Sequence, residues 1–227
     1  VGPTYSEYER EVTMDGGRCH YFSLTEDSSF RLDVPALTEE LSHNVDLLIL
    51  CNPNNPTSSV IPRNQMRDIL DYCKKKSITV LVDEAYVEFA PDVQAVTAIP
   101  LTEYYNNIII LRGISKFFAA PGLRLGYAIC GNKDLLKEIN QKKNPWTINS
   151  LAAIAGEIMF SDEEYIRKTR QLIASERERI CQAIRSMGAY QVYESNCNFV
   201  LVKIQKEGLT ADQIFDTAIR QGLMIRD

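Results

Sequence analysis

Three short, continuous apolar runs lie in the first half of the chain, each as long as a typical strand. They are "VDLLILC" (45–51), "ITVLVD" (78–83) and "NIIILR" (107–112). Unbroken apolar runs of this length predict strands buried on both faces, as in a parallel sheet covered by helices. Between the first two runs, residues 62–76 place apolar side chains at helical spacing, begin with Pro62 and end in lysines, which predicts a crossover helix. Residues 125–130 predict a further strand.

Polar residues gather just after three of these strands. They occupy Asn52–Thr57, Asp83–Tyr86 and Gly113–Lys116. In open α/β sheets, ligands bind beyond the carboxyl ends of the strands. The coincidence of three such clusters therefore predicts a binding site at this edge of the sheet.

The second half of the chain has a different pattern. Long helical patterns cover residues 148–160 and 162–187, and Gly188 is expected to end the second helix. The second pattern is heavily charged, which is typical of a solvated face over a core stripe.

Shorter elements follow these two helices. Residues 190–193 and 198–204 predict strands, a helix is expected after a cap at Thr210, and "LMIR" (223–226) predicts a last strand. We therefore expect an α/β domain with a mostly parallel sheet over residues 1–147, and a smaller α+β domain over residues 148–227.

Composition narrows the function classes. Of 227 residues, 45% are hydrophobic and the formal net charge is −5, so there is no basic surface of the kind that nucleic acid requires. No apolar run approaches the length of about 18 residues that spans a membrane, and the polar N-terminus does not resemble a signal peptide. The six cysteines are far apart and lack zinc-site spacing, which favours reduced thiols and a cytoplasmic location and predicts no metal site.

Lys116 is the first candidate for chemistry, because it interrupts an apolar stretch rich in small residues. It is either a surface lysine with its stem along apolar neighbours or a nucleophilic amine that forms a Schiff base. Asp83 ends a buried strand and is either a turn cap or a partner for a cation. Tyr86 fits core packing or the site, and Glu84 is expected to point to the opposite face from Asp83.

Three further candidates complete the set. Asn55 lies in the turn-forming stretch "NPNNPT" (52–57), and pure loop chemistry would also explain it. Ser115 and Arg124 are either ordinary surface residues or an anion site. Each residue alone has an ordinary structural explanation. Together they supply a lysine, a carboxylate, hydroxyl and amide donors and an anion site, which is the set that pyridoxal phosphate needs.

Three motifs carry a resemblance to a known family. They are "NPNNPT" (52–57), "VDEAY" (82–86) and "GISKFFAAPGLRLGY" (113–127). In this order and at these separations they resemble the pyridoxal-phosphate-dependent class I/II aminotransferases, which share the fold type I of aspartate aminotransferase. The resemblance extends from "PTYSEY" to "GLMIRD", nearly the whole chain. It implies a three-layer large domain with a mostly parallel sheet and a smaller C-terminal domain.

The resemblance also implies roles for seven residues. Lys116 would form the Schiff base and move the substrate proton, while Asp83 would keep the cofactor's ring nitrogen protonated. Asn55 and Tyr86 would bond the 3′-oxygen of the cofactor. Ser115 and Arg124 would bind the phosphate of the cofactor, and Tyr5 would stack on the face of its ring.

Within the family, the sequence resembles the histidinol-phosphate aminotransferases and the related threonine-phosphate decarboxylases. The expected function is transamination of a phosphorylated amino acid or amine. Decarboxylation of O-phosphothreonine is the first alternative, and the cofactor-sensing domain of a transcription regulator is an alternative of another class. The resemblance implies a homodimer that takes a small-molecule substrate and no membrane or nucleic-acid partner.

The sequence departs from the family pattern at several points. Ser58 replaces the glycine of "NPTG", and Gly113 stands where many relatives carry a hydroxyl for the phosphate. The N-terminal segment and the C-terminal, carboxylate-binding arginine of relatives are not found before Val1 or after Asp227. We therefore expect these 227 residues to be a core fragment that binds cofactor weakly and turns over slowly.

Overall fold

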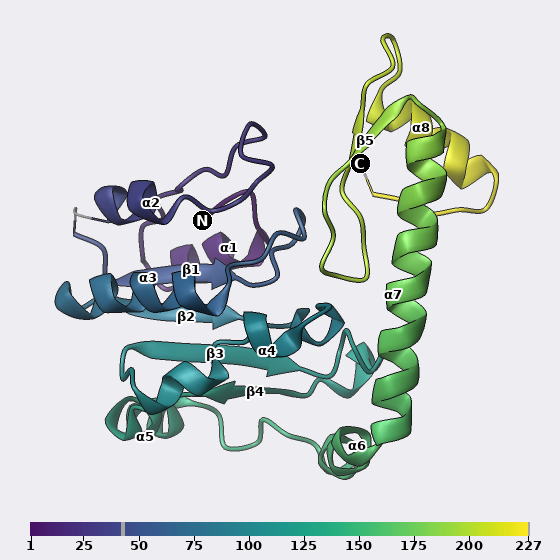
Figure 1. Cartoon of the computed structure of the whole chain (residues 1–227). Coiled ribbons are helices and arrows are strands. Elements are labelled where there is room, and N and C mark those ends of the chain that lie inside the picture. The colour runs from purple at the N-terminus through teal and green to yellow at the C-terminus, as the bar shows by residue number, and fades with distance from the viewer. Residues whose placement is uncertain (42–43, 227) are drawn as a thin grey trace.

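A four-stranded mixed sheet forms the centre of the computed structural model, which describes residues 1–41 and 44–226 (Figure 1). Its order is β1 (Leu47–Cys51), β2 (Thr79–Asp83), β3 (Ile108–Gly113) and β4 (Gly126–Ile129). The first three strands are parallel, with Cys51 opposite Asp83 and Asp83 opposite Leu111, and β4 is antiparallel to β3. The apolar runs thus form the predicted strands, and their carboxyl ends meet at one edge.

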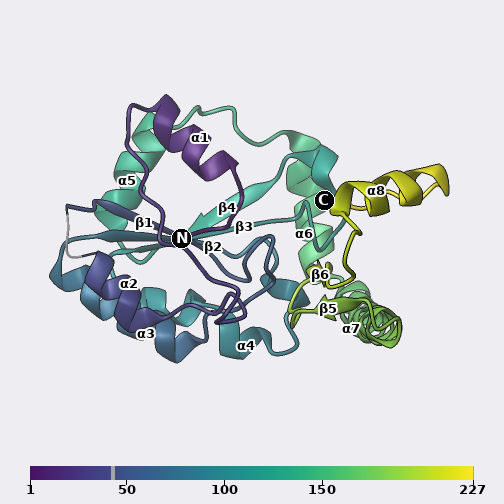
Figure 2. The same cartoon turned by 90° about the horizontal axis from the view of Figure 1, so that it is seen from above.

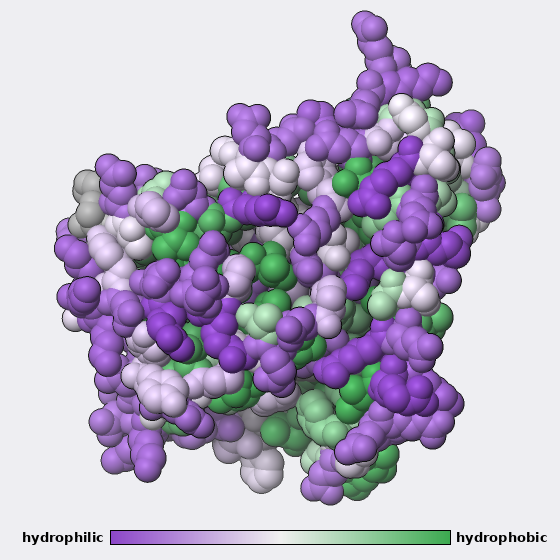
Figure 3. All heavy atoms as spheres, in the orientation of Figure 1, coloured by the Kyte–Doolittle hydropathy of each residue, from purple (hydrophilic) through white to green (hydrophobic). Residues whose placement is uncertain are grey.

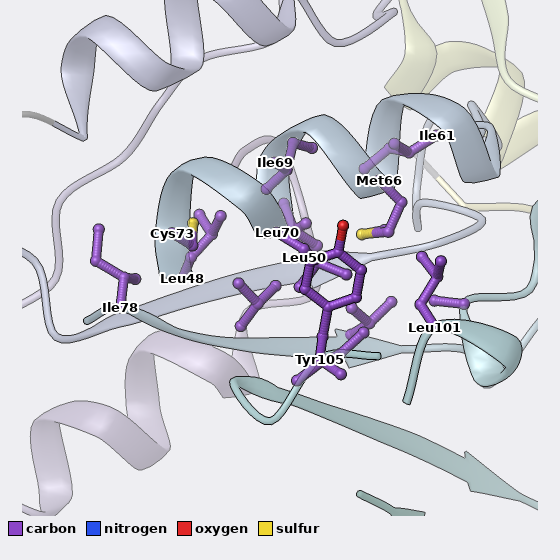
Figure 4. Close-up of a cluster of buried hydrophobic side chains, with 14 of the residues drawn as sticks. Leu48, Leu50, Ile61, Met66, Ile69, Leu70, Cys73, Ile78, Leu101 and Tyr105 are labelled. Carbon is purple, nitrogen blue, oxygen red and sulfur yellow. The ribbon is translucent and has the colours of Figure 1, made fainter. Parts of the chain in front are cut away.

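Helices cover both faces of this sheet (Figure 2). On one face lie α2 (Val34–Glu40), α3 (Arg63–Lys75) and the single turn α4 (Val93–Val96), and on the other lie α1 (Glu7–Met14) and α5 (Lys133–Lys142). The main core lies between α3 and the sheet (Figure 4). Met66, Ile69, Leu70 and Cys73 are fully buried there. This is the apolar stripe that predicted the crossover helix, and its burial anchors β1 and β2.

The rest of the chain is mainly helical. Helix α6 (Ser150–Ser161) leads into the 24-residue α7 (Glu163–Ser186), and Gly188 after it has a left-handed φ of 67°, as a helix-ending glycine should. The short antiparallel pair β5 (Tyr190–Val192) and β6 (Val202–Ile204) follows. Then α8 (Ala211–Arg220) begins at a capping box formed by Thr210 and Gln213.

One predicted element is wrong and several were not predicted. Residues 223–226 form no strand, because among the described residues no strand lies beside them to pair with their backbone. Leu223 and Met224 are accordingly exposed. Helices α1, α2, α4 and α5 were not predicted. Within the described residues, no helix is long and apolar enough to cross a membrane.

Gly131 lies between β4 and α5, where the backbone of Thr102 approaches it closely. A Cβ at this position would clash with the carbonyl oxygen of Thr102. Because a backbone atom cannot yield as a side chain can, we expect Gly131→Ala to lower the free energy of unfolding by about 1–3 kcal/mol. Denaturant unfolding measures this, with Gly122→Ala as the control, since a Cβ at Gly122 meets no atom within 4 Å. Equal midpoints for the two variants would contradict the prediction.

Candidate functional site

The carboxyl ends of β1, β2 and β3 bring the three polar clusters together. The amide of Asn52 donates to the carbonyl of Asp83 at 2.8 Å, and the amide of Glu84 donates to the carbonyl of Leu111 at 2.9 Å. At the carboxyl end of β3, Gly113 pairs with Gly126 of β4. The loops that carry Asn55, Asp83 and Lys116 therefore start from three adjacent, hydrogen-bonded strand ends, as predicted.

Asp83 is held in a fixed orientation. Its Oδ1 accepts the amide of Ala85 at 2.9 Å, and its Oδ2 accepts the hydroxyl of Tyr8 at 2.6 Å. Burial, together with the nearby Cys51 thiol and Asp83 carboxylate, strongly raises the pKa of Tyr8, so this phenol stays a neutral donor. Tyr8 was missed by the sequence analysis because helix α1, which carries it, was not predicted.

Tyr5 lies next to Tyr8. The two rings are edge to face, with centroids 5.6 Å apart, and Tyr5 remains largely exposed. The contact places Tyr5 beside the side chain that orients Asp83. Tyr5 and Asp83 thus belong to one cluster although 78 positions separate them in the sequence, from 5 to 83.

Lys116 is exposed, which corrects the expectation that it sits in an apolar environment. Its neighbours Ile114, Phe117 and Phe118 are buried instead, because the loop turns their side chains into a core and leaves Lys116 on the open side. The Lys116 Nζ lies 5.5 Å from the centroid of the Tyr86 ring. These two predicted site residues are therefore neighbours.

Arg124 is also exposed, and its backbone is left-handed with φ of 54°. Its guanidinium donates to the carbonyl of Pro121 at 2.9 Å. Across residues 1–41 and 44–226, neither Arg124 nor Lys116 forms an ion pair. Ser115 is half-buried, and in the described part of the chain no hydrogen bond joins it to Arg124.

Asn55 is half-buried, and its backbone lies against the thiol of Cys51, whose pKa burial raises to about 11. Two neighbouring asparagines fix the loop. Asn52 exchanges two hydrogen bonds with the backbone of Ile61, at 2.8 and 3.1 Å, and Asn54 donates to the carbonyl of Pro3 at 2.9 Å. The loop is thus tied to the N-terminal segment that leads to Tyr5.

A buried ionic cluster lies on the opposite face of the sheet. Glu84 is fully buried, and its Oε2 accepts Arg112 at 2.6 Å and the Thr97 hydroxyl at 2.8 Å. Arg112 also donates to Glu88 at 3.2 Å. Burial by itself lowers the pKa of Arg112, but the two carboxylates more than reverse this and raise it, so the guanidinium stays charged. Glu84 points away from Asp83, as expected from strand alternation.

The chain was compared with known proteins. The model of the family "Aminotransferase class I and II" matches residues 1–227. A histidinol-phosphate aminotransferase of Clostridium novyi is 34% identical over 227 residues, which is 100% of this chain and 60% of that protein. A threonine-phosphate decarboxylase of Salmonella typhimurium is 32% identical over 209 residues, 92% of this chain and 57% of the relative.

Solved structures of proteins with the same name as one of these relatives have a similar fold. The crystal structure of the histidinol-phosphate aminotransferase from Clostridium acetobutylicum superposes with a TM-score of 0.92 at 30% identity, covering 99% of this chain and 66% of that one. The enzyme of the same name from Sinorhizobium meliloti, solved in complex with pyridoxal-5′-phosphate, gives a TM-score of 0.84 at 26% identity over 98% of this chain and 59% of that one.

The chain belongs to the class I and II aminotransferase family, whose members depend on pyridoxal phosphate. It spans about 60% of the length of the curated relatives. The resemblance noted from the three motifs is therefore confirmed. In the described part of the chain, no group of three or more His, Cys, Asp or Glu residues could hold a metal ion.

Proposed function

We propose that this chain carries the cofactor-binding core of a pyridoxal-phosphate-dependent enzyme that transaminates a phosphorylated amino acid or amine. The observation that carries the proposal is the placement of two groups beyond the adjacent strands β2 and β3. One is the Asp83 carboxylate, held by Tyr8, and the other is the Lys116 amine, which lies beside Tyr86 and forms no ion pair among the described residues. When bound, pyridoxal phosphate supplies an electron sink for bonds at the substrate's α-carbon.

The donor set fits this cofactor. Asp83 would hold the protonated ring nitrogen, because its carboxylate is already oriented by a neutral phenol and a backbone amide. Arg124, an exposed cation without an ion pair in the described residues, would supply positive charge for the anionic phosphate.

The remaining residues complete the proposed site. Asn55 and Tyr86 would hydrogen-bond the ring oxygen of the cofactor. Tyr5 would cover the ring face and Ser115 would donate to the phosphate. Lys116 would bond the cofactor covalently and then move the proton at the substrate's α-carbon.

The phosphorylated substrate is proposed from the names of the relatives. A histidinol-phosphate aminotransferase and a threonine-phosphate decarboxylase both act on an amine that bears a phosphate group, as their names state. Because relatives of both names are similarly close to this chain, decarboxylation is the second candidate reaction. The reaction depends on which α-carbon bond lies perpendicular to the cofactor ring.

We further propose that residues 1–147 and 148–227 are the large and small domains of a homodimer. The apolar helix α6 supports an assembly, since Leu151, Ile154 and Ile158 are each at least 60% exposed. Apolar side chains, coloured green, reach the surface along the lower edge of Figure 3, in the region of α6.

We also propose a cytoplasmic location for the protein. Its six cysteines are free thiols, four of them buried, which is typical of a reducing compartment.

The test is covalent capture of the cofactor. Protein mixed with pyridoxal phosphate and reduced with borohydride is expected to gain the mass of one reduced cofactor, located on Lys116 by peptide mass spectrometry. One control uses pyridoxal phosphate whose aldehyde has first been reacted with glycine and reduced, which should not label the protein. The other is the peptide that carries the exposed Lys137, which should stay unlabelled. Labelling spread evenly over surface lysines would reject the assignment. The two candidate reactions are then separated by assaying keto-product formation from histidinol phosphate and carbon dioxide release from O-phosphothreonine.

A further inference from the structure

Ser58 has an unusual backbone for its residue type. It lies in the loop between β1 and α3 with a left-handed φ of 59°, and it is fully buried. Residues with a Cβ avoid this conformation, whereas glycine adopts it freely. A serine kept in this place therefore calls for a compensating interaction through its hydroxyl.

The Ser58 hydroxyl is bonded to a segment far away in the sequence. Its Oγ accepts the amide of Asn196 at 2.7 Å and lies 3.1 Å from the Oγ of Ser195. Because Ser195 donates its own proton to the carbonyl of Phe199 at 2.5 Å, Ser58 is the donor between the two serines. Asn196 also returns a side-chain bond to the Ser58 carbonyl at 3.1 Å.

These bonds lead to the candidate site. Residues 195–199 belong to the connection between β5 and β6, which reaches toward the loop after β1 (Figure 1). The ring of Phe199 packs edge-on against Tyr86, with centroids 5.2 Å apart and an interplanar angle of 89°. Tyr86 is the ring 5.5 Å from the Lys116 amine.

The segment has a second attachment. Arg177 of α7 donates to the carbonyls of Cys197, at 2.9 Å, and Phe89, at 3.2 Å. Loss of the Ser58 hydroxyl would thus loosen residues 195–199 without releasing them, so the fold survives the test.

We propose that the Ser58 hydroxyl is a positioning group that holds residues 195–199 against the β1–α3 loop and thereby keeps Phe199 on Tyr86. The attachment itself is independent of the reaction. Its effect on the cofactor rests on the proposed function.

The first experiment tests the attachment in the full protein without cofactor. Ser58→Gly removes the hydroxyl and suits the left-handed backbone. Ser77→Gly is the matched control, because Ser77 has the same φ of 59° but is exposed at the end of α3. Amide hydrogen exchange over residues 193–201 is expected to be about tenfold faster in Ser58→Gly than in Ser77→Gly. Equal exchange in the two variants overturns the proposal.

The second experiment tests the link to Tyr86. We expect Ser58→Gly to weaken the binding of pyridoxal phosphate about threefold to tenfold, and to add no further loss in a Tyr86→Phe background. If the two substitutions weaken cofactor binding independently in the Ser58→Gly/Tyr86→Phe double variant, Ser58 does not act through Tyr86. That result overturns the positioning role even if amide exchange over residues 193–201 is faster in Ser58→Gly. If the wild-type protein captures no cofactor, the proposed function fails, and the exchange comparison still decides whether Ser58 holds the segment.

Discussion

Lys116→Ala is expected to abolish turnover of histidinol phosphate and of O-phosphothreonine, with a loss of at least about a thousandfold in kcat. Lys116 is the one lysine in the sequence of the three motifs, and its Nζ lies 5.5 Å from the centroid of the Tyr86 ring. In the proposed mechanism it bonds the cofactor and moves a proton, and alanine can do neither. Steady-state assays of both reactions measure the loss.

The fold should be unaffected by this change. Lys116 is exposed and forms no ion pair among the described residues, so its removal leaves no buried charge without a partner. We expect the free energy of unfolding of Lys116→Ala to stay within about 0.5 kcal/mol of wild type. Lys137→Ala on α5, also exposed, is the control and should keep full activity. Residual turnover within tenfold of wild type in Lys116→Ala would refute the catalytic assignment.

Glu84→Gln is expected to give the largest loss of stability, about 3–5 kcal/mol in the free energy of unfolding. The substitution keeps the shape of the side chain but removes the fully buried carboxylate that Arg112 contacts at 2.6 Å, and leaves Glu88 at 3.2 Å as the remaining carboxylate partner of this largely buried guanidinium. Arg112→Met in the Glu84→Gln background should lower stability further, because it leaves the Glu88 carboxylate without the guanidinium that pairs with it at 3.2 Å. Denaturant unfolding of the single and double variants measures both effects.

A surface pair provides the comparison. Glu176 and Arg179 are 2.7 Å apart but exposed, so water and salt screen their attraction. Glu176→Gln should leave the unfolding midpoint unchanged. If Glu84→Gln changed the midpoint no more than Glu176→Gln does, the ionic cluster would contribute nothing to the stability of the strand ends that carry Asp83.

The sheet could be predicted because its signal is local. Each of β1, β2 and β3 is an unbroken apolar run, which predicted the strand. The expected burial on both faces was wrong in part: full and partial burial alternate along each strand, because α1 and α5 on one face bury none of their own residues and cover that face less completely. The predicted strand over residues 223–226 failed because a strand needs a neighbour, which an apolar tetrapeptide does not reveal. Residues 198–201 failed in part for the same reason, since pairing in β6 begins only at Val202.

The site was predicted less completely, because its contacts are distant in sequence. Tyr8 and Asp83 are 75 positions apart, and α1 has no buried residue and hence no clear amphipathic stripe. The burial of Phe117 and Phe118 beside an exposed Lys116 depends on a loop conformation that composition does not encode. Arg112 could have been found, because it follows Ile108 and Ile110 at strand spacing on the face to which Glu84 points.

Helix α7 makes a second connection between the lysine loop and residues 195–199, beside the contacts of Ser58 and Phe199. Tyr165 and Ile166 in its first turn pack with Phe117 and Phe118 beside Lys116, while Arg177 farther along binds the carbonyl of Cys197. At 1.5 Å per residue its 24 residues extend about 36 Å. As a rigid lever anchored beside the lysine loop, the helix would turn a tilt of about 5° into a displacement of about 3 Å at its far end. Small rearrangements around Phe117 and Phe118 would thereby reach the β5–β6 hairpin.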